Sequence, residues 1–428
     1  MKGSIKSKLL LLLTCSIILP VLLPAQVKIS SPYSRFGIGD LSGNTNTWIT
    51  SMGGLSISLN SPGHVNISNP ASYTAFDSLS FLFEGGITGN YMQLQTSIDK
   101  QNTNYASVGY LQAGFPITRW WRTSISLLPF SDMGYDVTTS EEIPGAGTAL
   151  KTYSGDGGLN QFVWGNGFRL FPNFSVGINA SLLFGSLQSG RNLYFPDSAL
   201  LISYKRIDNT TIKDIYLNYG IQYSHKLIKD IRMQYGGVFG LTTKLNAVDR
   251  ALGYTLFETS TGTEYPKDTL VNLEKAKGKI VIPFYMGGGI SIIKPNKWVF
   301  GVDYKWQKWT KYSAFGVNDS LSNAWKICAG GEVIPDYSSV SSYFKRVRYR
   351  FGLNYDKTYL ELRGKQINEY GLAVGFGFPL RGFRTLLNVG FAAGTRGTNA
   401  NGLIKESYLS MSLGFSIYER WFMKRKYN

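Results

Sequence analysis

The most regular feature of this chain is an alternation of apolar side chains with polar or small ones. Residues 408–418 read YLSMSLGFSIY, and every second side chain from Leu409 onward is apolar. The same alternation recurs over 298–306, 347–355 and 387–394. Because a β-strand points successive side chains to opposite faces, each segment predicts a strand with one apolar and one polar face.

Segments of this kind recur along most of the chain and predict fourteen strands. They are expected at 79–96, 103–118, 119–138, 155–171, 173–190, 211–227, 231–248, 276–293, 296–312, 324–334, 346–358, 366–379, 383–397 and 404–418. Short joints such as KPNK alternate with long polar ones at 139–155 and 249–276, and only 334–346 is longer than its place in this order predicts. An even number of strands with alternating short and long joints is typical of outer-membrane barrels.

Two fold classes remain open at this point, a secreted soluble β protein and a membrane barrel. Trp298 and Trp306 share the apolar parity of one predicted strand, eight residues apart. At about 3.3 Å per residue this is roughly 26 Å, close to the distance between the aromatic girdles of a membrane strand. The pattern therefore favours an all-β, transmembrane antiparallel β-barrel of about 14 strands over residues 78–420.

The amino-terminal residues read MKGSIKSKLLLLLTCSIILPVLLPAQ and predict a secretory signal peptide at 1–25, cleaved after Ala25. A membrane anchor is less consistent, because the apolar run is short of about 20 residues and contains Pro20. Lipidation of Cys15 is not expected, because Thr14 precedes it inside the apolar run. Cleavage would leave Cys328 as the single cysteine, so no internal disulfide is expected.

The chain is basic and aromatic. Its formal charge is +17, and loss of three signal-peptide lysines would leave +14 (17 − 3). Aromatic residues make up 14% of the chain, and no apolar run after residue 23 approaches the roughly 18 residues of a spanning helix. These properties fit a protein of the bacterial outer membrane that contacts membrane lipids and lipopolysaccharide. The basic tail at 421–428 is expected at the periplasmic rim.

Residues 26–77 precede the first predicted strand and are rich in Gly, Ser, Asn and Pro. A fourteen-stranded barrel is too wide for its own side chains to fill. We therefore expect this segment to lie in the lumen as a plug.

This segment also carries short motifs that resemble a known family. MGG at 52–54 is followed by NPA at 69–71, just before the first strand, in the manner of the FadL/TodX outer-membrane transporters of long-chain fatty acids and other hydrophobic compounds. Residues 344–360 are also similar to that family, and 31–41 resembles the mature start of its Bacteroidota-type members. The matching hatch residues are Met52, Gly53, Gly54, Asn69, Pro70 and Ala71.

The resemblance implies a hatch that closes the lumen and shifts when ligand binds, with sideways release through a kinked strand. Pro70 fixes its own φ and keeps Asn69 extended, which suits a stiff plug. Gly53 and Gly54 would allow a tight turn against the wall. Without the resemblance, these four residues read more simply as ordinary loop residues.

Charged residues on the lumen parity are candidates for ligand contact. Lys305, Arg348 and Arg350 could stabilise an anionic headgroup such as the carboxylate of a fatty-acid-like ligand. The alternative is structural pairing, for instance of Lys305 with Asp303. A first apolar contact for ligand is expected in the long outer loops, at Leu252, Tyr254, Leu256 and Phe257.

Catalytic and cofactor chemistry finds little support in the sequence. Only His64 and His225 are available for a histidine-based hydrolase or metal site, so we expect no enzyme, no metal and no cofactor. The basic charge is dispersed along the chain, which argues against nucleic-acid binding.

Two functions from different classes remain. The first is a passive channel for uptake of hydrophobic molecules, gated by the hatch. The second is a barrel of the same fold that does not transport and serves as a subunit or scaffold of an outer-membrane export or assembly complex, with a protein partner.

Overall fold

The computed structural model describes residues 31–43, 46–145, 147–196, 201–258, 263–380 and 385–421. The predicted signal peptide lies outside these ranges, as do all residues of the predicted tail after Trp421. No helix in the described part of the chain is long and apolar enough to cross a membrane.

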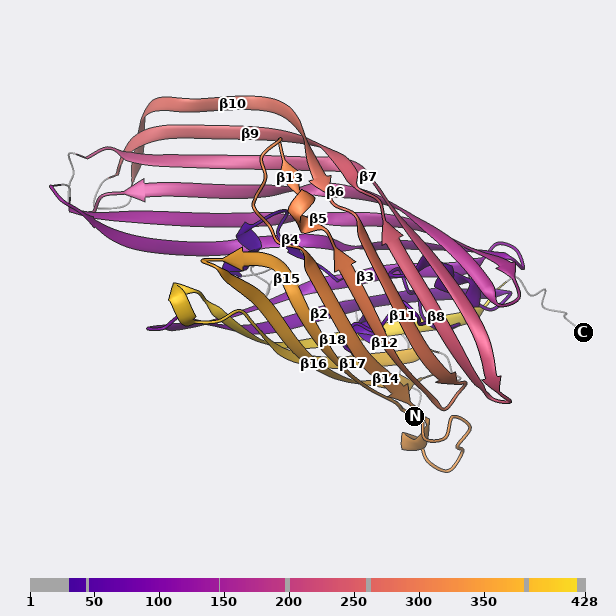
Figure 1. Cartoon of the computed structure of the whole chain (residues 1–428). Coiled ribbons are helices and arrows are strands. Elements are labelled where there is room, and N and C mark those ends of the chain that lie inside the picture. Colours follow the sequence, from indigo (N-terminus) through magenta and orange to yellow (C-terminus); the bar gives the residue numbers. More distant parts are fainter. Residues whose placement is uncertain are drawn as a thin grey trace, which may run out of the picture.

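Long antiparallel strands dominate the molecule (Figure 1). The strands are β1 (Asp40–Leu41), β2 (Ser80–Gln95), β3 (Lys100–Pro116), β4 (Trp121–Ile143), β5 (Gly147–Phe171), β6 (Phe174–Tyr194), β7 (Ser203–Ile228), β8 (Ile231–Gly240), β9 (Thr243–Glu258), β10 (Glu264–Ile282), β11 (Tyr285–Lys294), β12 (Trp298–Gln307), β13 (Ser313–Ala314), β14 (Ala324–Val333), β15 (Arg348–Leu362), β16 (Lys365–Pro379), β17 (Leu386–Arg396) and β18 (Lys405–Arg420). The short helices are η2 (Pro32–Arg35), α2 (Thr47–Thr50), η3 (Pro70–Ala75), η4 (Trp309–Lys311), η5 (Phe344–Arg346) and η6 (Ala400–Gly402).

The strands close into one ring, because β18 pairs along its length with β2. Two wall strands are interrupted, at 241–242 between β8 and β9 and at 283–284 between β10 and β11. With each interrupted strand counted once and the two-residue strands β1 and β13 set aside, the described residues form fourteen wall strands. The predicted antiparallel barrel is thus confirmed, with an N-terminal region in its lumen.

The two parities of each strand face opposite surroundings. On β18, Leu409 and Met411 are exposed on the outside, whereas Ser412 and Ser416 are buried on the lumen side. This is the reverse of a water-soluble barrel, whose buried parity is apolar. An apolar outer band is what a barrel needs when lipid surrounds it.

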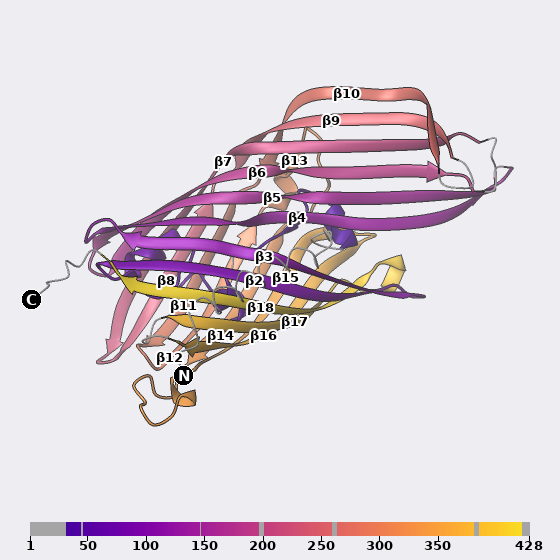
Figure 2. The same ribbon diagram turned by 180° about the vertical axis from the view of Figure 1, so that it is seen from behind.

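One side of the barrel is much taller than the other. The outer parts of β4 to β7, β9 and β10 continue beyond the ring as a curved sheet, the tall wall (Figures 1 and 2). Segments 139–155 and 249–276, predicted as outer loops, are paired strands within it, and the chain reverses between Ile143 and Gly147 and between Glu258 and Glu264. The prediction of loops was wrong because it was based on the drop in hydropathy along these segments. Such a drop marks where the surrounding lipid ends, whereas strand pairing can continue into water.

The four residues expected to capture ligand in an outer loop lie instead on β9 within this tall wall. Leu252 and Phe257 are exposed, Tyr254 is half-buried and Leu256 is buried. Their position in a loop was therefore wrong, while their role in ligand capture stays a prediction.

A seam runs through the wall between β3 and β4. These strands pair only over 111–116 with 122–127. Beyond that stretch, the edge of β4 pairs with β1 of the N-terminal segment, at Asp132 and Ser131. The N-terminal segment thus supplies a short strand where the neighbouring wall strand has turned away.

Candidate functional site: the lumen plug and its cavity

Residues 46–54 form a single helical turn that ends on two glycines. Asn46 caps α2, since its side-chain oxygen accepts a hydrogen bond from the Ile49 N–H at 3.0 Å. Gly53 and Gly54 follow with φ of 69° and 93°, and the Gly54 N–H donates to the Ile49 carbonyl at 3.1 Å. Such left-handed positions favour glycine at a helix C-terminus, which explains the paired glycines of the motif.

The same turn lies directly on the barrel wall. A Cβ added to Gly53 would come within 2.7 Å of the backbone nitrogen of Leu353 on β15. A Cβ on Gly352 of β15 would come within 2.1 Å of the carbonyl carbon of Met52. Plug and wall therefore meet backbone to backbone, and only glycines on both sides allow this approach.

The second hatch motif is fixed by its asparagine. The Asn69 side-chain amide donates to the carbonyl of Ile57 in the plug at 2.7 Å and to that of Ile221 on β7 at 3.2 Å. Its oxygen accepts from the Ala71 N–H at 3.1 Å. Pro70 begins η3, and its backbone lies against wall glycines. One buried side chain thus joins two plug segments to the wall.

Asp303 forms hydrogen bonds with the plug and does not pair with Lys305. One of its carboxylate oxygens accepts hydrogen bonds from the N–H groups of Ser56 and Ile57, each at 2.6 Å. Lys305 lies two residues further along β12, with its ammonium 4.4 Å from the centre of the Tyr285 ring. The pairing considered from the sequence is therefore absent between these two residues, and Asp303 instead anchors the plug backbone.

Arg348 and Arg350 converge on one buried carboxylate. Glu332, on the neighbouring β14, accepts from Arg350 at 2.7 Å and from Arg348 at 3.1 Å. Arg350 also donates to the Asn388 side chain at 2.7 Å. Both guanidinium groups thus have structural partners, as the pairing alternative expected.

Two further wall residues that anchor the plug, Arg396 and Glu406, were not identified from the sequence. Arg396 on β17 donates to both carboxylate oxygens of Asp40, to Glu406 and to the hydroxyl of Ser31. The Ser31 hydroxyl in turn donates to Glu406 at 2.6 Å. Arg396 and Glu406 both fall on the lumen parity of their strands, and that parity is the signal that could have indicated them.

His64 is part of another buried group at the base of the plug. Its Nδ1 lies 2.7 Å from Glu84 on β2, its ring stacks on Trp48 at 4.7 Å, and Glu84 also accepts from the Val65 N–H at 2.7 Å. Burial lowers the pKa of His64 below its usual 6.5 and so favours the neutral imidazole.

The arrangement resembles a hydrolase triad only in composition. The Ser416 hydroxyl donates to the Glu84 oxygen that also contacts the histidine, and it lies 3.3 Å from Nδ1 of His64, the nitrogen on the carboxylate side. In a triad the serine faces the opposite ring nitrogen. All three side chains are buried, so the group holds the plug and has no catalytic geometry.

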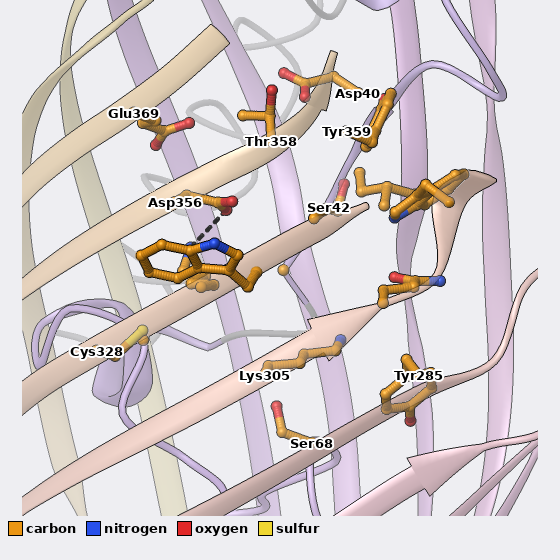
Figure 3. Close-up of a pocket in the computed structure, with 18 of the residues that line it drawn as sticks. Asp40, Ser42, Ser68, Tyr285, Lys305, Cys328, Asp356, Thr358, Tyr359 and Glu369 are labelled. Atoms are coloured by element: carbon orange, nitrogen blue, oxygen red, sulfur yellow. Dashed lines mark ion pairs between the residues drawn. The ribbon is translucent and has the colours of Figure 1, made fainter. Parts of the chain in front are cut away.

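A cavity of about 410 Å³ remains between the plug and the wall (Figure 3). Lys305 points into it, and Lys326 lies 3.7 Å from Asp356 along one side. Its other labelled lining residues are Asp40, Ser42, Ser68, Tyr285, Cys328, Thr358, Tyr359 and Glu369. The lining thus combines aromatic surface with several charged groups. Among the described residues no group of three or more His, Cys, Asp or Glu side chains could hold a metal ion.

These observations define a class: a fourteen-stranded outer-membrane barrel whose own N-terminal segment occupies the lumen. Solved structures of the same fold include a Pseudomonas aeruginosa FadL homologue, at TM-score 0.56 and 12% identity over 90% of this chain and 100% of that one. The Pseudomonas putida toluene transporter TodX aligns at TM-score 0.58 and 14% identity over 90% and 100%, respectively. The Ralstonia pickettii toluene transporter TbuX aligns at TM-score 0.58 and 11% identity over 89% and 99%.

Comparison of the sequence with protein-family models assigns the family. The BamG family model matches residues 5–428, and the chain belongs to the BamG family. No curated protein matches the chain. The chain is a β-barrel of the bacterial outer membrane, and its expected likeness to FadL and TodX is confirmed for the fold.

Proposed function

We propose that this chain is a plugged barrel subunit of the Bam outer-membrane assembly machinery, and that it does not transport hydrophobic molecules. Membership of the BamG family supports this role over uptake. The FadL-like fold is compatible with either role, because one fold serves many functions and function depends on the site.

The observation that carries the proposal is the number of independent anchors on the plug. Arg396 holds Asp40, Asp303 holds the Ser56 and Ile57 backbone, and Asn69 bridges the plug to β7. Each anchor is largely or fully buried, and removal of one partner leaves an unsatisfied group in a place shielded from water. A plug held in this way is suited to staying closed.

The cavity also argues against uptake of apolar cargo. Lys305, Lys326 and Asp356 bring charge to its lining, and an apolar molecule there would have to desolvate these groups. Ligand sites for apolar compounds are instead lined mainly by hydrophobic and aromatic side chains. Ligand contact by Lys305 therefore remains a secondary proposal, for a small anionic group.

The tall wall offers a surface that a transport channel does not need. It extends the strands β4 to β7, β9 and β10 far beyond the other strands of the ring (Figure 1). Beyond its pairing with β9, β10 pairs among the described residues only with β13, at Ile280 and Val281. Such a curved sheet is suited to contacting other proteins outside the cell.

The test is native extraction of an affinity-tagged chain from its own outer membrane. We expect a stoichiometric complex with components of the assembly machinery, and depletion of the chain should lower the amounts of other folded outer-membrane barrels. A tagged chain recovered alone, together with impaired fatty-acid or toluene uptake on its depletion, would refute the proposal and favour the channel.

A further inference from the structure

The joint between β14 and β15, residues 334–347, is unusually long for its end of the barrel. The other joints at the same end span 117–120, 172–173, 229–230, 295–297 and 380–385. Figures 1 and 2 both show the 334–347 segment as a folded excursion beyond the ring, at the end away from the tall wall. Periplasmic turns of such barrels are short, so the extra residues do more than connect two strands.

This joint, the periplasmic loop, is held in one shape by its own hydrogen bonds. The Asp336 N–H donates to the Lys345 carbonyl at 2.8 Å, which closes the loop at its base. The Asp336 carboxylate accepts from the Ser338 N–H and hydroxyl at 3.1 and 3.0 Å. The Tyr343 hydroxyl donates to the carbonyl of Pro379, the last residue of β16, at 3.0 Å. A loop ordered before binding loses little conformational entropy when a partner docks.

The loop nevertheless presents apolar side chains to water. Val340 at its tip is 99% exposed and Phe344 is 70% exposed. Leu380, which follows the Pro379 that Tyr343 contacts, is 61% exposed. Exposed apolar side chains on a rigid support are the usual anchors of protein interfaces.

Basic residues lie in the loop and in the adjacent turn. Lys345 and Arg346 follow Phe344 directly, and Arg346 lies 5.3 Å from the centre of the Tyr343 ring. Lys297 belongs to the adjacent turn, and its backbone carbonyl accepts a hydrogen bond from the Ile334 N–H at 2.7 Å. Asp336 is the only acidic residue within 334–347, and its carboxylate is already bonded within the loop. The positive charge of Lys345, Arg346 and Lys297 therefore complements carboxylates on a partner's surface.

Insertion into lipid does not explain the exposed residues. Val340 is flanked on each side by two serines, and irregular backbone surrounds it. Hydrocarbon would leave those hydroxyls and backbone N–H groups without water or partners, at a cost of several kcal/mol for each unsatisfied group. A protein surface can satisfy them by hydrogen bonds.

We propose that the periplasmic loop docks a folded periplasmic protein domain, in which an apolar groove takes Val340 and Phe344 and rim carboxylates meet Lys345 and Lys297. The inference rests on the proposed function in one respect, that the partner is a component of the assembly machinery.

The first experiment places a photo-crosslinking phenylalanine derivative at 340 or 344 in the full chain, in its native outer membrane. The matched control is the same group at Ile228, which is 68% exposed at the end of β7, next to the turn to β8. We expect a discrete protein adduct from 340 and 344 that is absent from 228. Adducts with lipid alone, no adduct, or the same adduct from 228 would overturn the inference.

The second experiment combines Phe344→Ala with Lys345→Glu in the tagged chain. We expect at least a tenfold loss of the crosslinked protein from the purified complex, while the barrel keeps its heat-modifiable mobility on gels. If the wild-type chain yields a complex and the variant keeps it intact, the docking inference fails and the proposed function stands. If the wild-type chain is recovered alone, both fail.

Discussion

Arg396 donates hydrogen bonds to both carboxylate oxygens of Asp40, at 2.8 and 2.9 Å, although 356 residues separate the two in sequence. Asp40 belongs to β1, which pairs with the free edge of β4, whereas Arg396 lies on β17. In the wall, β18, β2 and β3 lie between β17 and β4, so the pair ties the start of the plug to a second part of the wall.

Arg396→Ala should release this end of the plug. The change leaves Glu406 buried and without its cationic partner, and breaking a buried pair in this way costs about 3–5 kcal/mol. We expect a lower unfolding temperature in detergent and new protease cleavage between Ser31 and Asn46. The control is Arg206→Ala, since Arg206 pairs with Asp208 in the tall wall with more of its side chain exposed and should cost about 0–1 kcal/mol. Equal effects of the two changes would contradict the anchoring role.

Gly53→Ala should disturb the contact between plug and wall. The new methyl group would lie 2.7 Å from the Leu353 nitrogen, on a residue whose φ is 69°. Strained backbone of this kind costs about 1–3 kcal/mol before the clash is added. Gly89→Ala on β2 is the control, because nothing lies within 4 Å of its added Cβ. Thermal unfolding of both variants compares them, and an unchanged midpoint for Gly53→Ala would refute the close packing.

Asp303→Asn should loosen the plug while the barrel stays folded. The amide cannot accept two N–H bonds with the strength of a carboxylate, and hydrogen bonds to charged groups contribute about 1.5–3 kcal/mol. We expect the wild-type barrel to conduct little current in planar bilayers and the variant to show frequent openings. Wild-type conductance like that of an open pore would contradict a closed plug.

Acid should weaken the plug through His64. Burial lowers its pKa below the 6.5 of the unfolded chain, so the folded state binds fewer protons. The stabilisation from the neutral ring is complete above pH 6.5 and declines as the pH falls below that value. We therefore expect the unfolding temperature to drop on acidification, and His64→Gln to reduce the slope below pH 6.5. Identical slopes in the wild-type chain and the His64→Gln variant would refute this role.

The wall strands could be predicted because their evidence is local. Side chains of β12 and β18 alternate with a period of two, and lipid outside and polar groups inside amplify that alternation. The ends of the strands were less predictable: residues 139–155 and 249–276 are rich in polar residues, and their pairing in the tall wall depends on neighbouring strands and not on their own hydropathy.

Some residues of the candidate site could likewise be identified from the sequence, and others could not. The glycines at 53 and 54 and the Asn69-Pro70 pair could be identified because they resemble the short motifs of the FadL/TodX family. Arg396 and Glu406 could be assigned a lumen parity but no partner, since Asp40 lies on another strand and no short-range rule connects them. For Lys305 and Asp303 the sequence suggested a pair that does not form. They occupy neighbouring lumen positions on one strand, but Lys305 contacts the Tyr285 ring and Asp303 binds the plug backbone.

By itself, then, the sequence determined a basic, all-β membrane barrel with an N-terminal segment before it, because alternation, aromatic spacing and glycine content are properties of neighbouring residues. Only the tertiary structure decided which charges pair, where the plug meets the wall, that β1 fills the seam beside β4, and that the loop at 334–347 stands rigid with Val340 exposed. Those features depend on contacts between residues hundreds of positions apart, or on the combined geometry of several strands, and closure of the barrel brings them together.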